Sequence, residues 1–241
     1  AECILEWGSI LREQTKFEEA LKIYQKIDLE SIKLQPELVA QLHRKKGTIY
    51  KNILQNILRD IDKNSIINEI DNQAMDEYSM AIFALKNMNN VPEMIAILSE
   101  QTEATLKIAK VIPEMRSMAD IYNNQEAKLL SYLPIPDRMV VYLRELSKMD
   151  ELDGNYISAL ERLQSAKQYA VQYTLSFRIF EVNYQLGRLV DRAWLYFTKE
   201  QREIGITALE DALRYPLAED NQYRIICIRT KERIQQKMCG D

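Results

Sequence analysis

The sequence predicts an all-α fold, and two features of it carry that prediction. Apolar residues recur every three or four positions along nearly the whole chain, as they do on one face of an amphipathic helix. Gly and Pro together make up only about 5% of the 241 residues, against an average share of about 12%. We find no convincing stretch with the strict apolar–polar alternation that marks a half-buried strand.

The expected helices can be placed in order along the chain. Clear apolar faces run through residues 17–27, 78–88, 159–173 and 208–213. Prolines, which the first turn of a helix tolerates, mark further helix starts at Pro36, Pro92, Pro113 and Pro136. Connections are expected at Asp28 and at residues 64–65, 89–90, 134–136, 153–154 and 215–216. This gives about eleven helices, and the short loops between them predict antiparallel neighbours.

One spacing recurs between pairs of helices. Gly8 is followed twelve positions later by Ala20 and four positions after that by Tyr24. The two small residues would let the helices approach closely, and Tyr24 would fill the space beside them. Similar second helices are expected around Ala81, Ala159 and Ala208. In this interpretation only the first hairpin carries a glycine in its first helix.

This pattern resembles the tetratricopeptide repeat, a helical hairpin of about 34 residues. The resemblance is good over residues 1–28 and 154–173 and fair over 76–90. It implies a right-handed α-solenoid of stacked antiparallel hairpins, forming a single helical-repeat domain over residues 1–241. The polar stretch 59–75 is expected to form either an irregular connection or, because Ile66, Ile67 and Ile70 lie within it, a short helix. The alternative to the repeat fold is a helical bundle without repeats. Because the chain opens inside a helical pattern, we expect it to be a fragment of a longer protein.

Composition excludes several classes of protein. The net charge is −4, whereas nucleic-acid-binding domains usually carry a basic stripe. Uninterrupted apolar runs reach only about five residues, which is too short to span a membrane. The three cysteines, Cys3, Cys227 and Cys239, lie far apart and suggest neither a disulfide framework nor a zinc site. These features predict a cytoplasmic protein, and they leave homo-oligomer formation open.

Catalytic motifs were sought without success. His43 is the only histidine, and its neighbours Arg44, Lys45 and Lys46 suggest a surface or interhelical residue. The sequence contains neither of the glycine-rich patterns that cradle phosphates. We therefore predict a protein that is not an enzyme and that uses no cofactor and no metal.

Candidate ligand-binding residues follow from the predicted solenoid, whose concave face is lined by the first helix of each hairpin. In the first hairpin this row runs near Ser9 and Arg12. Before Gly154 the equivalent row contains Arg144 and Lys148, two cations one turn apart that could hold an acidic segment. Chaperone-binding tetratricopeptide domains use a Lys and an Asn in these places, so the Lys at 148 departs from that clamp.

A second pair of candidates is Asn52 and Asn56, also one turn apart, with Arg59 beyond them. Side-chain amides offer both a donor and an acceptor to the backbone of an extended peptide. Peptide-pheromone receptors of Gram-positive bacteria, which resemble this chain only in architecture, use asparagines in this way.

The sequence therefore favours a non-catalytic scaffold that presents a concave groove to a protein or peptide segment. If Arg144 and Lys148 bind this segment, the segment is expected to be acidic. The alternative is a ligand-sensing regulatory domain of a larger signalling or transcription-regulating protein, similar to a pheromone receptor or to the sensor of a signalling ATPase. Neither hypothesis includes direct binding of nucleic acid or membrane.

Overall fold

The computed structural model describes residues 1–57, 64–86 and 88–240, and these residues confirm the all-α prediction. They form twelve α-helices and two short 3-10 helices, with no strand in the described part of the chain. The first seven helices are α1 (Glu2–Glu13), α2 (Phe17–Tyr24), α3 (Leu29–Ile32), α4 (Pro36–Ile57), α5 (Asn64–Lys86), α6 (Val91–Ala109) and α7 (Arg116–Tyr132), with η1 (Pro113–Met115) before α7. The other five are α8 (Pro136–Leu152), α9 (Tyr156–Gln172), α10 (Ser176–Arg192), α11 (Lys199–Leu213) and α12 (Gln222–Gly240), with η2 (Trp194–Tyr196) before α11.

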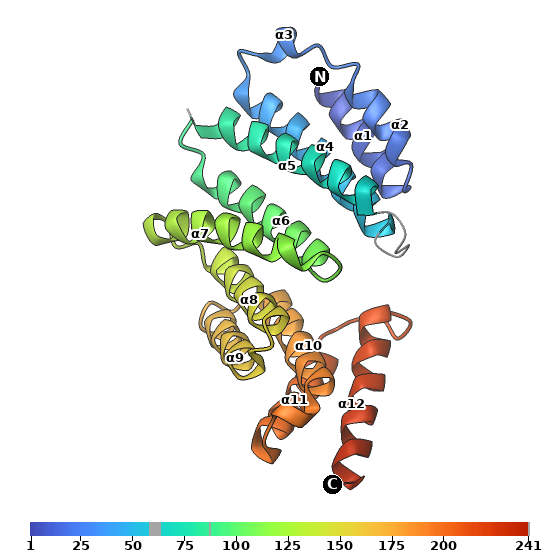
Figure 1. The fold of residues 1–241 in the computed structure, drawn as a ribbon, viewed down its shortest axis with the longest axis vertical. Coiled ribbons are helices and arrows are strands. Elements are labelled where there is room, and N and C mark those ends of the chain that lie inside the picture. The colour runs from blue at the N-terminus through green and yellow to red at the C-terminus, as the bar shows by residue number, and fades with distance from the viewer. Residues whose placement is uncertain (58–63, 87, 241) are drawn as a thin grey trace. The chain divides into compact units, whose positions relative to one another are not determined.

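The helices group into two compact units. Unit 1 comprises Ala1–Leu133 and unit 2 comprises Pro134–Asp241. Within each unit, the helices pair as hairpins that follow one another in chain order (Figure 1). Unit 1 contains the hairpins α1–α2, α4–α5 and α6–α7, and unit 2 contains α8–α9 and α10–α11 followed by α12.

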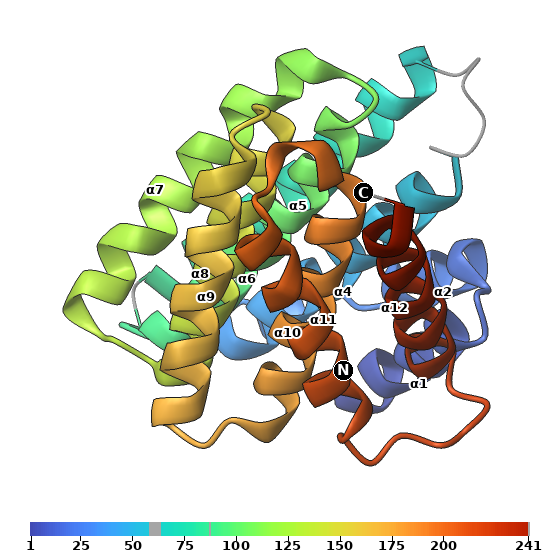
Figure 2. The same ribbon diagram turned by 90° about the horizontal axis from the view of Figure 1, so that it is seen from below.

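The stacking of these hairpins has a regular rule. The first helix of a hairpin packs against both helices of the preceding hairpin: α4 against α1 and α2, α6 against α4 and α5, and α10 against α8 and α9. Helix α12 contacts α10 and α11 in the same way and so takes the place of a further first helix (Figure 2). This nearest-neighbour packing is typical of helical-repeat proteins. The predicted right hand of the stack stays a prediction.

Glycines set the close approach inside three of the hairpins. Gly8 of α1 faces the ring of the fully buried Tyr24, and an added Cβ would lie 2.1 Å from Tyr24 Cε1. In the second hairpin Gly47 faces Tyr78, with the corresponding distance at 2.9 Å.

The second glycine contact corrects one prediction from the sequence. The first hairpin is not alone in having a glycine in its first helix, because Gly47 and Gly187 occupy similar positions in α4 and α10. In the second hairpin Tyr78 of α5 takes the role that Tyr24 has in the first. The long helices α4 and α5 displace this contact from the spacing of an ideal repeat.

Three connections share one turn geometry. After α1, α8 and α9 a residue with positive φ follows the helix: Thr15 (62°), Gly154 (76°) and Thr174 (53°). Beyond each, the next amide donates back five residues into the helix, as Leu175 N does to Ala170 O at 2.9 Å. This hydrogen-bond pattern is the Schellman motif, which normally carries glycine at the positive-φ position.

The predicted helix starts are confirmed, whereas one predicted connection is partly wrong. Pro36 and Pro136 begin α4 and α8, Pro113 begins η1, and Pro92 is the second residue of α6. The connection predicted at 64–65 lies inside α5, which begins at Asn64, and the helical alternative for 59–75 is correct from that residue on. Residues 58–63 lie outside the described part of the chain. Ile67 and Ile70 continue the helical period through the first turns of α5.

Candidate functional site

Ion pairs connect successive first helices within each unit. In unit 1, Arg44 of α4 pairs with Glu93 and Glu100 of α6, and its Nε donates to Glu100 Oε1 at 3.1 Å. Lys51 of α4 also reaches α6, with Nζ 2.9 Å from Glu103 Oε2. Burial alone would lower the pKa of Arg44, but its hydrogen bonds and its attraction to Glu100 and Glu93 outweigh burial and raise it. These charges therefore hold α4 and α6 in one register.

Unit 2 repeats the arrangement between α8 and α10. Arg178 donates to both carboxylate oxygens of Asp137, at 2.7 and 2.9 Å. Glu181 accepts from Arg178 Nη1 at 2.6 Å and from Arg144 Nη1 at 2.9 Å. Hydrogen bonding to Arg178 is the main cause that lowers the pKa of Asp137.

Helix α12 is attached to α10 by the same kind of contact. Asp191 accepts from Arg233 Nη2 at 2.7 Å and from Lys237 Nζ at 2.8 Å. Burial by itself would raise the pKa of Asp191, and the two cations more than compensate, so the pKa lies below its usual range. An ion pair between adjacent first helices is thus a recurring feature of both units.

The predicted cationic site on α8 falls within this set of contacts. The side chain of Arg144 is only 12% exposed, and its guanidinium donates to Glu181 and Gln185 of α10. Lys148 is half-buried on the same helix and also has a partner. Arg144 therefore has a structural role between helices, and its binding of an acidic ligand, with that of Lys148, stays a prediction.

The first-hairpin candidates also contribute to packing. Ser9 is buried, donates to Leu5 O at 2.9 Å and lies 3.4 Å from the hydroxyl of Tyr24. Its hydroxyl also accepts from Lys45 of α4. Arg12 is half-buried, with Nη2 3.7 Å from Glu13 Oε1. The row through Ser9 therefore faces the interior of the hairpin more than the groove.

The two candidate asparagines, Asn52 and Asn56, lie near the C-terminal end of α4. Asn52 is half-buried and Asn56 is exposed. Asn56 lines a hollow of about 430 Å³ beside the turn between α1 and α2, together with Phe17 and Ile53. Arg59, expected beside them, lies outside the described residues. Unit 1 therefore holds Ser9, Arg12, Asn52 and Asn56, whereas Arg144 and Lys148 belong to unit 2.

His43 is confirmed as an interhelical residue. It is buried in α4, and its Nδ1 lies 2.6 Å from Glu77 Oε2 on α5. Lys46 approaches the other oxygen of the same carboxylate at 3.6 Å. The basic run 44–46 is thus divided among ion pairs to different helices.

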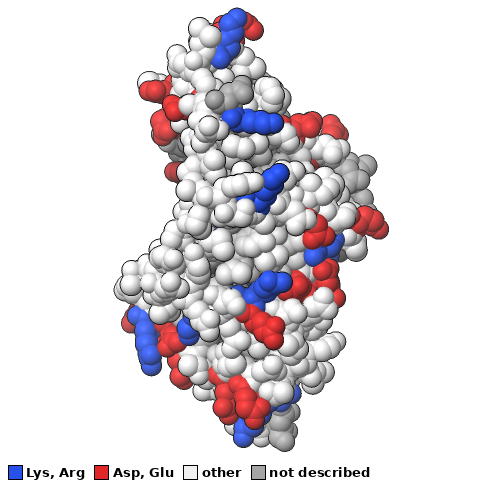
Figure 3. All heavy atoms as spheres, turned by 90° about the vertical axis from the view of Figure 1, so that its left-hand side faces the viewer, with Lys and Arg blue, Asp and Glu red and all other residues white. Residues whose placement is uncertain are grey.

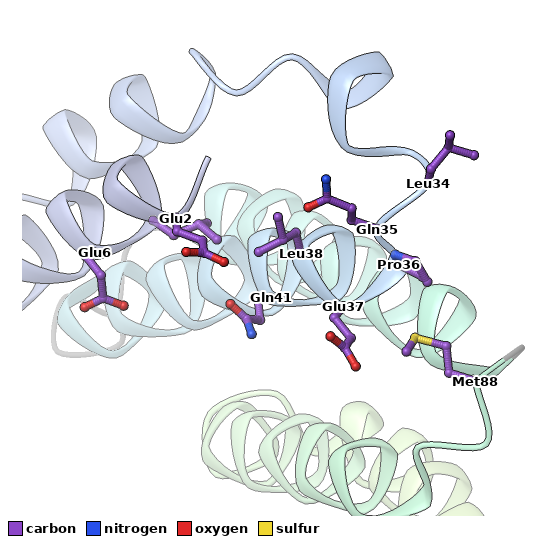
Figure 4. Close-up of a pocket in the computed structure, with 10 residues that line it drawn as sticks. Glu2, Glu6, Leu34, Gln35, Pro36, Glu37, Leu38, Gln41 and Met88 are labelled. Carbon is purple, nitrogen blue, oxygen red and sulfur yellow. The ribbon is translucent and has the colours of Figure 1, made fainter.

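One hollow in unit 1 was not predicted from the sequence. It encloses about 620 Å³ where the N-terminal turns of the first helices α1 and α4 lie beside each other (Figure 4). Its lining is half apolar and half polar and consists of Glu2, Leu5, Glu6, Leu34, Gln35, Pro36, Glu37, Leu38, Gln41 and Met88. We call this hollow the α1–α4 pocket. A volume of this size is within the range of small-molecule and peptide-anchor sites, roughly 300–1,000 Å³.

The side chains of the α1–α4 pocket are arranged by helical spacing. Glu2 and Glu6 are one turn apart on α1, and Glu37 and Gln41 are one turn apart on α4. Figure 4 shows Glu6, Gln41 and Glu37 pointing to the same side of the two helices. All four side chains are exposed, whereas Leu5 beneath them is only 2% exposed. This spacing was visible in the sequence, but only the packing of α1 against α4 brings the two pairs together.

The charged groups on the face that Figure 3 draws are of mixed sign, with Lys and Arg groups interspersed with Asp and Glu groups. Among the described residues, no group of three or more His, Cys, Asp or Glu side chains is placed to hold a metal ion. No helix in the described part of the chain combines the length and apolarity that crossing a bilayer requires.

Comparison of the sequence with protein-family models and with curated proteins finds no match. The interpretation of the α1–α4 pocket therefore rests on its own geometry. It has an apolar floor for side chains, amides that can pair with a peptide backbone, and carboxylates at its rim. It contains no nucleophile–base pair among its ten lining residues.

Proposed function

We propose that the chain is a non-catalytic recognition module that binds a segment of another protein on the face formed by the first helices of its hairpins. The observation that carries this proposal is the α1–α4 pocket, which at about 620 Å³ exceeds two other hollows of unit 1, at about 430 and 420 Å³. Its lining, half apolar and half polar, offers both the apolar contacts and the hydrogen-bonding groups that a bound peptide needs.

The regular stacking supports the same function. Helical-repeat proteins use the surfaces formed by successive repeats to bind extended partners. Fold alone does not determine function, so the proposal depends on the pocket rather than on the resemblance to tetratricopeptide repeats. The alternative role as a ligand-sensing domain would also need an occupied pocket, and no separate observation favours it.

We also propose a cytoplasmic location. Cys3 and Cys239 are exposed and unpaired, and Cys227 is buried without a disulfide partner. Burial raises the pKa of the Cys227 thiol to about 11, which keeps it in the inert protonated form. Exposed free thiols are most compatible with a reducing compartment.

The test is a selection of peptides from a random display library on the 241-residue protein. The blocking variant is Gln41→Trp, which places a large ring in the pocket from an exposed position on α4. The matched control is Gln73→Trp, because Gln73 is also an exposed glutamine within a helix but does not line the pocket. Circular dichroism of all three proteins checks that the helices are retained.

We expect enriched peptides that bind the wild-type protein and the Gln73→Trp variant but not the Gln41→Trp variant. Enrichment that is equal on all three proteins would place recognition on another surface. No enrichment on the folded wild-type protein would contradict peptide recognition itself.

A further inference from the structure

We propose that the α1–α4 pocket binds a basic segment of a partner protein, in which an apolar side chain is flanked by Lys or Arg. This inference rests on the proposed function and names the chemistry of its partner. The apolar side chain would contact Leu5, Leu38 and Met88, and the cations would lie against the glutamates of the rim.

The side chains that line the pocket carry a net negative charge. Its ten lining residues include three glutamates, Glu2, Glu6 and Glu37, and neither Lys nor Arg. The N-terminal turns of α1 and α4 contribute positive partial charges of only about half a unit each. Three carboxylates exceed these partial charges, so the pocket remains attractive to cations.

Ion pairs join the other first helices. Glu100 is matched by Arg44, Glu181 by Arg144, and Asp191 by Arg233. In each case the cation comes from the neighbouring first helix. Carboxylates on this face are therefore normally neutralised when two first helices stack.

The α1–α4 pocket departs from that rule. Glu6 has one distant partner, Lys45, whose Nζ is 3.8 Å from Glu6 Oε1. Glu2 and Glu37 form no ion pair with any of the residues that the structure describes. Both are exposed and free to reorient. A bound Lys or Arg would supply at this position the cation that the neighbouring helix supplies elsewhere.

The other half of the pocket lining is apolar. Leu38 is half-buried, and Met88 is 36% exposed at the turn that precedes α6. A methionine can adapt its flexible side chain to different apolar partners. A purely cationic ligand would leave this surface uncovered, so we assign an apolar residue to the middle of the bound segment. Gln35 and Gln41 are placed to pair with its backbone.

The display selection provides the test when it is repeated on charge variants. In Glu2→Gln/Glu37→Gln the two unpaired carboxylates become neutral amides of the same size. The control Glu69→Gln/Glu114→Gln removes the same charge from two exposed glutamates outside the pocket. A third variant, Glu2→Lys/Glu37→Lys, reverses the sign at the pocket.

We expect the wild-type protein to enrich peptides with Lys or Arg beside Leu, Ile, Met or Phe. Affinity of one such peptide, measured by fluorescence anisotropy, should fall about two- to thirty-fold in Glu2→Gln/Glu37→Gln, because two exposed ion pairs are lost and each contributes about 0.2–1 kcal/mol. The control should bind as the wild type does. The reversed variant should select acidic peptides, and binding of the basic peptide should weaken as salt rises.

Outcomes separate this inference from the proposed function. Suppose the wild-type protein enriches acidic or uncharged peptides and Gln41→Trp abolishes their binding. The pocket then binds peptides, but the inference of a basic partner is wrong. If basic peptides are enriched but bind the Glu2→Gln/Glu37→Gln variant and its control equally, the cations lie elsewhere and the inference is also wrong. If no peptide depends on the pocket, the proposed function fails first.

Discussion

The substitution Gly8→Ala probes the contact that sets the distance between α1 and α2. An added Cβ would lie 2.1, 2.5 and 2.7 Å from three atoms of the Tyr24 ring. Ordinary contact begins near 3.4 Å, so the ring would have to move by more than about 1 Å in a site where it is fully buried. Its hydroxyl would move away from Ser9 and Leu5 at the same time.

The magnitude follows from two opposing effects. Overpacking a core usually costs about 1–3 kcal/mol, and a lost hydrogen bond adds about 1 kcal/mol. Replacing glycine by alanine in a helix returns about 1 kcal/mol. We therefore expect Gly8→Ala to lower the free energy of unfolding by about 1–3 kcal/mol. Gly47→Ala, with its closest contact at 2.9 Å, should be nearly neutral because the helix gain offsets a smaller displacement of Tyr78.

Urea unfolding followed by tryptophan fluorescence can measure this in unit 1. The chain has two tryptophans, Trp7 in α1 and Trp194 in unit 2, so a Trp194→Phe background leaves Trp7 as the reporter. In a Tyr24→Leu background the ring is absent, and Gly8→Ala should then cost little. An equal cost with and without the ring, or a Gly8→Ala protein as stable as the wild type, would refute the steric explanation.

Three further predictions concern a buried carboxylate, an ion-pair network and a turn. Burial raises the pKa of Asp71 from 3.8 to about 6, so the folded state holds its proton more tightly and stability falls as pH rises from about 4 to 6. In urea unfolding at pH 7.5, Asp71→Asn should therefore be more stable than the wild type by about 1–3 kcal/mol, and this difference should shrink toward pH 4. A difference in stability that does not vary with pH would contradict the raised pKa of Asp71. Glu181→Gln should lower the free energy of unfolding by about 1–3 kcal/mol, because Arg144 and Arg178 both lose their shared carboxylate. Arg144→Met should lower it less, since Arg178 still pairs with Glu181. If thermal melts show the reverse order of stability, this ion-pair network is wrong. Thr174→Gly should stabilise the protein by about 0.5–1 kcal/mol, because relief of the positive-φ cost exceeds the added chain entropy; a lowered melting temperature would argue against strain at this turn.

Helices were the most predictable part of this fold. The apolar period and the four prolines at helix starts are local signals, so the helices they predict do not depend on the tertiary arrangement. The contact between Gly47 and Tyr78 could not be derived in the same way, because the lengthened hairpin α4–α5 separates the two residues by far more than Gly8 and Tyr24 are separated. Thr15 and Thr174 were equally hidden, since β-branched residues seldom adopt positive φ.

The candidate site was harder to predict for a related reason. Arg144 has the spacing of a ligand-binding cation in the sequence, but its partner Glu181 lies on the next first helix and becomes visible only when the hairpins stack. The acidic residues Glu2 and Glu37 occupy first turns, where carboxylates commonly stabilise a helix by its dipole. Only the packing of α1 beside α4 turns two ordinary first turns into one pocket.

The stacking rule described above also has a mechanical consequence. Because each hairpin contacts only its neighbours in the chain, a pulling force applied along one unit passes through every interface between hairpins in series. A detached hairpin such as α8–α9, with about 37 residues, would lengthen to at most about 120–130 Å when fully extended. The ion pairs between first helices lie at these interfaces, and their strength depends on ionic strength. Each unit is therefore a series of hairpins that can separate at their interfaces, and the force needed to separate them depends partly on salt concentration.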